Sequence, residues 1–246
     1  IPAQVLRQVK QTLIAGGIST RYIEAGSDAA LSSVVITKQN VIDIAIIVRE
    51  NSFVIGQTVA VQDFEDWNIR DYSRPASDPH RGMLPPKVAR MIVNIAKRGV
   101  AIHADDTLLD PFCGVGTVLT EAMQVGWRVL GCDIDADAVV KTKKNLSWAQ
   151  AHFGLRTRDT PQVYQGDATH VAELIAAGSV HAVVTEPFLG DLALTARGKE
   201  IKMEQVKNTL KGLEKLYIGC LRQWVKVLKS HGTVVIALPL YVIGGR

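Results

Sequence analysis

The sequence contains 246 residues with a formal net charge of +4, and 47% of its residues are hydrophobic. This length supplies one large α/β domain and a smaller attached segment. The sequence lacks the run of roughly 18 apolar residues that a membrane span needs, and it lacks the apolar run of a secretory signal. We therefore expect a soluble, cytoplasmic protein. The mild basic charge is compatible with a polyanionic partner but does not demand one.

The three cysteines lie far apart in the sequence, which argues against a disulfide framework and against a structural zinc site. Cys113, Cys132 and Cys220 form no CxxC pair. No cluster of His, Cys or carboxylate residues has the spacing of metal ligands, so we expect no metal. Because the chain starts with Ile1 rather than Met, we also expect it to be a processed product or part of something longer.

Residues 1–66 predict a small accessory α/β segment. A helical pattern comes first, then a short strand pattern, then two stretches rich in β-branched residues, over Pro2–Ile14, Thr20–Glu24, Val41–Val48 and Ser52–Val61. The pair Glu50–Asn51 between the last two stretches predicts the turn of a β-hairpin.

Residues 67–246 predict the main domain. Trp67–Pro86 is dense in Pro, Arg, Asp and Ser and has no sustained period, which predicts a linker or a structured loop. A helix is expected over Lys87–Ala96. The two prolines directly before it suit the start of a helix, because the first backbone N–H groups there need no partner within the helix. From Thr107 on, strands and helices alternate, which predicts a Rossmann-like, doubly wound, mostly parallel α/β sheet. The expected strands are Thr107–Leu109, Arg128–Cys132, Val163–Gln165, Ala182–Thr185 and Thr233–Leu238, and the expected helices between them are Val115–Val125, Ala136–Trp148, His170–Ala177 and Met203–Leu228.

The loop Asp110–Gly116 follows the first strand, where a doubly wound sheet binds its ligand. Gly114 and Gly116 let the backbone approach a ligand closely, and the next helix offers free N–H groups and a positive dipole end. The three-glycine GxGxxG spacing is absent, which disfavours pyrophosphate. Asp133, 23 positions after Asp110, ends the second strand, where an acid reaches the ribose hydroxyls of an adenosine ligand.

Three motifs resemble the cofactor motifs of class I S-adenosylmethionine-dependent methyltransferases: DPFCGVGT from Asp110, GCDID from Gly131 and QGDAT from Gln165. The resemblance implies that S-adenosyl-L-methionine is the cofactor and that nine residues bind it: Asp110, Pro111, Cys113, Gly114, Gly116, Asp133, Ile134, Asp167 and Ala168. The first loop would line the methionine part, Asp133 would hold the ribose, and the others would contact adenine.

A structural role is the alternative for the acidic residues of these motifs. Asp135 and Asp137 are expected to cap the helix that follows them and to interact with its dipole. Asp133 could belong to the same group, but its place at the strand end favours the ligand role. Asp167 could likewise be a plain N-cap of the helix expected at His170.

The strand that ends at Thr185 leads into Glu186-Pro187-Phe188-Leu189-Gly190, where amino-group methyltransferases place the signature Asp/Asn-Pro-Pro-Tyr/Phe. The exocyclic amine of a base is a poor nucleophile, so it needs an acceptor for its N–H and a fixed line to the methyl sulfonium. We predict that Glu186 is this acceptor, that Pro187 stiffens the turn and that Phe188 stacks on an extruded base.

The target motif departs from the common pattern in three places. Glu186 replaces Asp or Asn, Phe188 replaces the second proline, and Leu189 stands where the aromatic residue is usual. The extra methylene of Glu moves the carboxylate by roughly 1 Å, and such a displacement can cost about a hundredfold in rate unless the loop compensates. A structural Glu-Pro turn after a core strand is the alternative.

The segment Arg70–Ala96 resembles the stretch before the cofactor motif in the THUMP-associated tRNA guanosine-10 N2-methyltransferases. The resemblance covers about Gln57–Pro239 and implies methylation of the exocyclic N2 amine of a guanosine in tRNA. It also implies a preceding THUMP domain, of which residues 1–66 are a remnant or the following linker, and a C-terminal truncation before the usual antiparallel hairpin. A small activating protein subunit is a further expected partner.

Five basic residues at the start of this domain are predicted to meet RNA phosphates: Arg70, Arg74, Arg81, Lys87 and Arg90. A solvated charged face is the alternative for them. Two other functions stay open from the sequence. One is amino-group methylation of rRNA or DNA bases, and the other is a non-catalytic RNA-binding subunit whose target motif has drifted.

Overall fold

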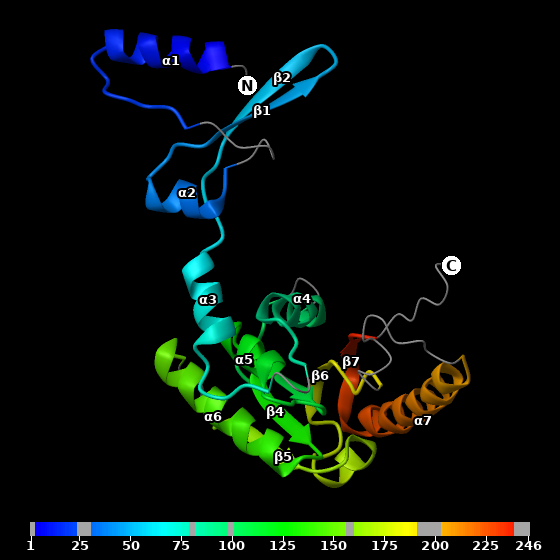
Figure 1. Ribbon diagram of the computed structural model, residues 1–246. Coiled ribbons are helices and arrows are strands. Elements are labelled where there is room, and N and C mark those ends of the chain that lie inside the picture. The colour runs from blue at the N-terminus through cyan, green and yellow to red at the C-terminus, as the bar shows by residue number, and fades with distance from the viewer. Residues whose placement is uncertain are drawn as a thin grey trace. The chain divides into compact units, whose positions relative to one another are not determined.

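The computed structural model (Figure 1) describes residues 3–23, 31–78, 82–97, 101–155, 160–190 and 203–238. The chain divides into two compact units, Ile1–Asp66 and Trp67–Arg246. Within the described part of the chain, no helix combines the length and apolar character that a membrane span requires.

The first unit contains α1 (Ala3–Ala15), α2 (Ser33–Lys38), β1 (Ile44–Arg49) and β2 (Ser52–Gln57). The antiparallel pairing of β1 and β2 places Arg49 opposite Ser52, which confirms the predicted hairpin. The strand predicted from Thr20 is wrong for residues 20–23, which have no regular structure, and its last residue lies outside the described residues. The sequence reading also missed α2, whose first turn is capped by Ser32.

The second unit is built on a parallel five-stranded sheet with the order β5-β4-β3-β6-β7. Its strands are β3 (Thr107–Asp110), β4 (Arg128–Asp133), β5 (Gln162–Gln165), β6 (Val180–Thr185) and β7 (Leu228–Ile236). The chain builds outward from β3 in one direction and then returns to its other side at β6. This reversal defines a doubly wound, Rossmann-like sheet and confirms the predicted fold class.

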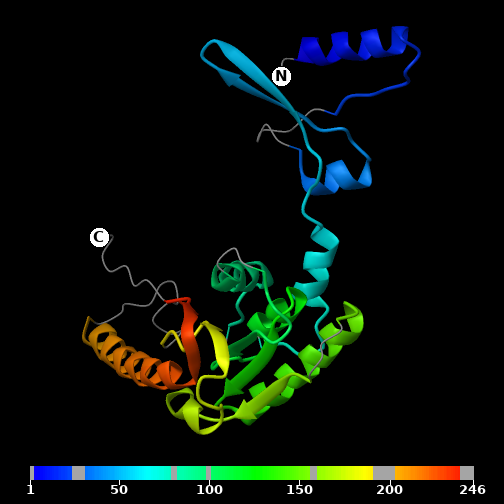
Figure 2. The same ribbon diagram turned by 180° about the vertical axis from the view of Figure 1, so that it is seen from behind.

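Helices cover both faces of this sheet, as Figure 1 and the view from behind in Figure 2 show. Side chains alternate between the faces of a strand, so Leu108 packs into one core cluster and Leu109 into the other. The first cluster joins α4 (Pro86–Lys97), α5 (Thr117–Gln124) and α6 (Ala136–His152), and the second joins η1 (Ala168–Glu173) and α7 (Met203–Val227).

Two expected elements of the second unit differ from the structure in type. The predicted helix His170–Ala177 is instead the short 3₁₀ helix η1, which begins earlier at Ala168. The predicted linker is wrong in its first part, because α3 (Phe64–Tyr72) extends into it. The side chains that hold this helix come from distant parts of the sequence, so its local pattern did not reveal it.

A buried ion-pair cluster holds the end of α3 in the second unit. Glu121 of α5 is only 1% exposed, and its carboxylate lies 3.0 Å from Arg70 Nη1 and 2.7 Å from Arg90 Nη2. The guanidinium of Arg70 also stacks on Trp67, 4.5 Å from the ring centroid. Burial raises the pKa of Glu121, and the two arginines oppose that rise.

Asn145 of α6 fixes the segment that follows α3. Its side-chain amide accepts from the Ala76 N–H at 2.9 Å and donates to the carbonyls of Ala76 and Val115 at 2.9 and 2.8 Å. Arg74 donates to the Thr117 hydroxyl at 2.7 Å. The lead-in to α4, residues 67–78, is therefore bound to the loop and helix that follow β3.

Replacing Glu121 with Ala should lower the free energy of unfolding by about 3–5 kcal/mol, because it leaves two guanidinium groups in the interior without their shared counter-charge. Urea unfolding of the wild type and the variant measures this difference. Glu214→Ala, which removes an exposed carboxylate from α7, should change the free energy by less than about 0.5 kcal/mol. Equal losses in the two variants would contradict the role given to the cluster.

Candidate functional site

Two loops leave the same edge of the sheet next to each other. β3 and β6 are neighbours, with Leu108 opposite Ala182 and Leu109 opposite Val183. The loop after β3 therefore lies beside the loop after β6, at the point where the strand order reverses and where such sheets bind ligands. A side-chain hydrogen bond joins the two strand ends, because the Thr185 hydroxyl donates to Asp110 Oδ1 at 2.6 Å.

Asp110 is a buried carboxyl group at the junction of these loops. It is 2% exposed and also accepts a hydrogen bond from the Phe112 N–H at 3.1 Å. Burial raises the pKa of Asp110 to about 7, with a smaller contribution from the charges of Asp133 and Glu186, while the two hydrogen bonds oppose the rise. This carboxyl group therefore changes its charge near neutral pH.

The glycines of the first loop have left-handed backbones. Gly114 has φ 52° and Gly116 has φ 84°, a region that side chains disfavour. A Cβ atom on Gly116 would lie 2.9 Å from Thr142 Cγ2, whereas one on Gly114 would meet no atom within 4 Å. Gly116 is also the N-cap of α5 and makes no side-chain cap, so the first N–H groups of this helix receive no side-chain acceptor from the N-cap.

Asp133 at the end of β4 supports the first loop. Its two carboxylate oxygens accept from the N–H groups of Gly114 at 2.9 Å and Asp135 at 3.0 Å. Each oxygen keeps a second lone pair for a ligand hydroxyl. Asp135 caps α6 by accepting from the Asp137 N–H at 2.9 Å, which confirms its predicted structural role.

The third motif lies beside the second. The Gly166 N–H donates to the Asp133 carbonyl at 2.9 Å, so QGDAT is bound to the end of β4. Asp167 caps η1 by accepting from Thr169, and these hydrogen bonds lower the pKa of Asp167. Ala168 is buried, whereas Ile134 is 71% exposed and presents an apolar surface above the edge.

The remaining predicted donor-site residues shape the loop from inside. Pro111 and Cys113 are buried. The Cys113 N–H donates to the Cys132 carbonyl at 3.0 Å, and burial raises the pKa of the Cys113 thiol. A buried neutral thiol is a poor nucleophile, so Cys113 contributes shape rather than reactivity.

The loop after β6, residues 186–190, is called the target loop here. It contains the three predicted catalytic residues in three different environments. Glu186 is half-buried, and burial raises its pKa. Pro187 is buried, whereas Phe188 is 58% exposed. Gly190 ends the described part of the loop with φ 100°. The loop thus presents a carboxyl group, a rigid proline and an exposed ring one after another, beside the loop that follows β3.

The predicted phosphate contacts are mostly turned inward. The side chains of Arg70, Arg74 and Arg90 are 12%, 6% and 21% exposed, and they bind Glu121 or Thr117 as described above. Lys87 is exposed. Arg81 lies outside the described residues. Ion pairs with Glu121 hold Arg70 and Arg90, and the hydrogen bond to Thr117 holds Arg74.

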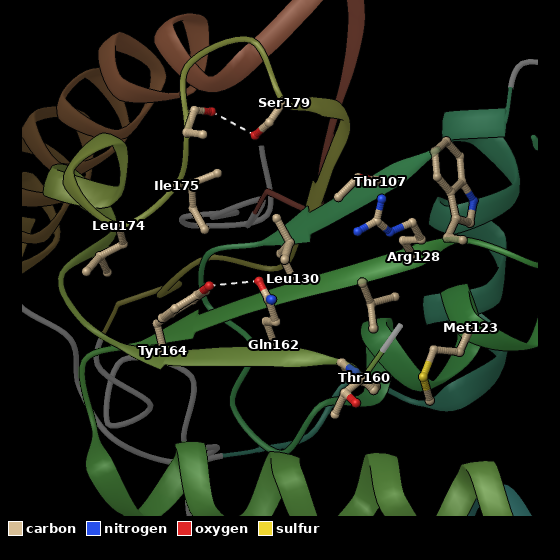
Figure 3. A pocket seen from close by; sticks show the side chains of 14 residues that line it. Thr107, Met123, Arg128, Leu130, Thr160, Gln162, Tyr164, Leu174, Ile175 and Ser179 are labelled. Carbon is tan, nitrogen blue, oxygen red and sulfur yellow. Dashed lines mark hydrogen bonds between the residues drawn. The ribbon is translucent and has the colours of Figure 1, made fainter. Parts of the chain in front are cut away.

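A cavity of about 330 Å³, shown in Figure 3, opens at the opposite edge of the sheet. Its lining includes Thr107, Arg128 and Gln162, which begin β3, β4 and β5. None of the sequence-predicted site residues that the structure describes lines it. The cavity is therefore separate from the candidate site.

Several polar residues that support the site were not predicted from the sequence: Glu121, Thr142, Asn145, Thr185 and Tyr217. A signal was available for Glu121, because a charged residue in the apolar stretch of α5 needs a partner. The others have no local signal. Among the described residues, no group of three or more His, Cys, Asp or Glu side chains is placed to hold a metal ion.

A family model for RMKL-like methyltransferase domains matches residues 73–241. The curated relatives include two proteins named tRNA (guanine(10)-N2)-dimethyltransferase. The protein from Methanothermobacter thermautotrophicus is 34% identical over 191 residues, which are 77% of this chain and 48% of that protein. The protein from Methanocaldococcus jannaschii is 29% identical over 83% of this chain and 51% of that protein. The chain thus spans about half the length of these relatives.

Solved structures also resemble the chain. One is a precorrin 8w decarboxylase from Methanobacterium thermoautotrophicum, which is 20% identical with a TM-score of 0.46 over 68% of this chain and 70% of the other. Another is an RNA methyltransferase from Salinibacter ruber in complex with S-adenosyl-L-homocysteine, which is 24% identical with a TM-score of 0.34 over 43% of this chain and 60% of the other.

The raised pKa of Asp110 predicts a pH-dependent stability. The folded protein holds this proton up to about pH 7, whereas the unfolded chain releases it near pH 4, so the group's contribution to stability is lost as the pH rises through that interval. The variant Asp110→Asn keeps an oxygen for Thr185 but cannot titrate. Relative to this variant, the free energy of unfolding of the wild type should fall by on the order of 3 kcal/mol as the pH rises to about 7, and should then stay constant. Urea unfolding between pH 4.5 and 8 measures the difference, and parallel curves would contradict the assignment.

Proposed function

We propose that this chain, which belongs to the family of RMKL-like, S-adenosylmethionine-dependent methyltransferase domains, methylates the exocyclic N2 amine of a guanosine in tRNA. The observation that carries this proposal is that two loops begin side by side on neighbouring strands. One is the loop Asp110–Gly116, which we call the donor loop because it would hold the methyl donor, and the other contains Glu186-Pro187-Phe188. The hydrogen bond from Thr185 to Asp110 joins them. The names of the curated relatives support the choice of tRNA and of the guanine N2 position.

The donor side fits S-adenosylmethionine, which supplies an electrophilic methyl group on a sulfonium. The open space at Gly114 and the uncapped N–H groups of α5 suit a carboxylate. The carboxyl groups of Asp110 and Asp133 suit an ammonium and ribose hydroxyls. The exposed side chain of Ile134 offers a flat apolar contact for adenine. Charged and apolar parts of the ligand would thus meet partners of matching chemistry.

The acceptor side needs a base that receives a hydrogen bond from the amine and takes its proton. Glu186 can take the proton only in its ionised form, because a carboxyl group that is already protonated has no free basic oxygen for it. Because burial raises its pKa, methyl transfer should increase with pH through the titration of Glu186. Pro187 holds the backbone, and the exposed ring of Phe188 offers a stacking surface to an extruded guanine.

The substrate side extends beyond the described site. Lys87 is the described member of the predicted phosphate contacts that is exposed. We propose that Ile1–Asp66 is an accessory unit connected with a THUMP domain, as the family resemblance implies. A tRNA substrate would place the protein in the cytoplasm, and a small activating subunit stays a prediction of the resemblance.

Glu186→Gln should reduce methyl transfer into tRNA at least a hundredfold, because the amide cannot take the proton that the amine releases. Incorporation of a radiolabelled methyl group measures the rate, and nucleoside analysis identifies the methylated base. Binding of S-adenosylhomocysteine, measured by calorimetry, should stay within about twofold of the wild type because Glu186 is assigned to the acceptor and not to the donor.

Glu214→Gln is the matched control, since it neutralises an exposed carboxylate on α7. Its methylation rate should equal that of the wild type. Full activity in Glu186→Gln would overturn the catalytic role of this residue. Clear binding of S-adenosylhomocysteine with no methylation of any RNA by the wild type would instead favour a non-catalytic subunit.

Gly116→Ala should weaken binding of S-adenosylhomocysteine at least tenfold, because the new Cβ meets Thr142 at 2.9 Å and the backbone has a positive φ. Calorimetry measures the affinity. Gly212→Ala, in the middle of α7 with open space around it, should leave the affinity unchanged and raise stability by about 0.5–1 kcal/mol. Equal affinities in the two variants would remove the donor loop from the binding site.

A further inference from the structure

The long helix α7 contacts both halves of the candidate site. On the donor side, a Cβ atom placed on Gly219 would lie 3.3 Å from Thr169 Cγ2, so α7 passes very close to η1, which follows Asp167. On the acceptor side, the hydroxyl of Tyr217 donates a hydrogen bond to the backbone carbonyl of Phe188 at 2.8 Å. Both contacts come from one turn of the helix.

The position of Tyr217 on α7 explains its direction. It follows Leu213 by four residues and precedes Cys220 by three, and side chains at these spacings share a helix face. Leu213 is 5% exposed and Cys220 is fully buried. Tyr217 is only half-buried, and it extends from this packed face to the loop after β6. Trp224, which is 2% exposed, anchors the same helix further along.

The target loop is fixed firmly at its start and less firmly where Phe188 lies. The Ala237 N–H donates to the Thr185 carbonyl at 3.0 Å, and the Thr185 hydroxyl is bound to Asp110. Residues 186–190 have no regular structure. The Phe188 ring is 58% exposed, so burial of its own side chain gives it little support.

We propose that Tyr217 is a positioning residue, which holds the Phe188 backbone at a set place relative to the donor site. This inference rests on the proposed function. Because α7 lies against both η1 and the target loop, its rigid body fixes the separation of acceptor and donor. Methyl transfer needs the amine in line with the sulfonium, and a displacement of about 1 Å can cost on the order of a hundredfold in rate. The hydroxyl of Tyr217 therefore acts on the rate rather than on donor binding.

The test removes only the hydroxyl, with Tyr217→Phe in the whole protein. The single-turnover rate of methyl transfer to tRNA should fall about tenfold, as expected for the loss of one hydrogen bond that sets the geometry. The affinity for S-adenosylhomocysteine should stay within about twofold. Hydrogen exchange measured by mass spectrometry should be at least threefold faster in peptides that contain residues 186–190, and unchanged in those from β3 and β4.

Tyr164→Phe is the matched control. It also deletes one phenolic hydroxyl, which donates to Gln162 Oε1 at 2.8 Å on β5, away from the target loop. This variant should keep the wild-type rate and the wild-type exchange in residues 186–190. If Tyr217 only stabilised the fold, Tyr217→Phe would make hydrogen exchange faster in the core clusters on both faces of the sheet. It would also leave the single-turnover rate of methyl transfer unchanged, and that result would overturn the proposal.

The two proposals fail in different ways. If the wild type binds S-adenosylhomocysteine but methylates no RNA, the proposed function fails, and loop exchange alone then decides the role of Tyr217. Unchanged exchange in Tyr217→Phe would overturn the anchor whether or not the wild type is active. Faster loop exchange with an unchanged rate in an active enzyme would overturn the positioning role.

Discussion

The hydrogen bond from Thr185 to Asp110 joins the ends of two neighbouring strands at the edge where both loops of the site begin. Parallel pairing brings the two loops to the same edge, and this hydrogen bond adds a direct side-chain link between the two strand ends. Burying a carboxyl group is costly, and burial raises the pKa of Asp110 to about 7. Hydrogen bonds from Thr185 and Phe112 offset part of this cost.

A second set of contacts holds the donor loop from the other side. Asn145 bonds the lead-in segment and the loop carbonyl of Val115, and Arg74 bonds the first residue of α5. Glu121 of the same helix forms ion pairs with Arg70 and Arg90. The lead-in is thus a structural part of the region around the loop after β3. Because Arg70, Arg74 and Arg90 bond to residues inside the domain, little of their side-chain surface is left exposed.

The sequence was sufficient where the cause of the structure is local. Gly114 and Gly116 have positive φ values, which glycine adopts without steric cost, and the alternation of strands and helices predicted the doubly wound sheet. It was insufficient where the partner is distant. In the sequence, Arg70 is predicted to contact phosphates, since nothing near it shows another partner. Its partner in the structure, Glu121, lies 51 residues away. Helix α3 was missed for the same reason, since tertiary contacts hold it.

The altered target motif can be explained by comparing what holds the loop in each case. In the common motif, a second proline fixes φ and limits the movement of the aromatic residue. Phe188 stands there instead, so the backbone gains freedom at the residue that presents the ring. The hydrogen bond from Tyr217 to the Phe188 carbonyl restricts the same backbone from outside. Under the proposed function, Glu186 would supply a longer acceptor, whose reach adds a methylene to that of Asp. Under the proposed function, an anchored loop with a longer acceptor would place the carboxylate where a stiffer loop places a shorter one, and the substitutions would compensate each other.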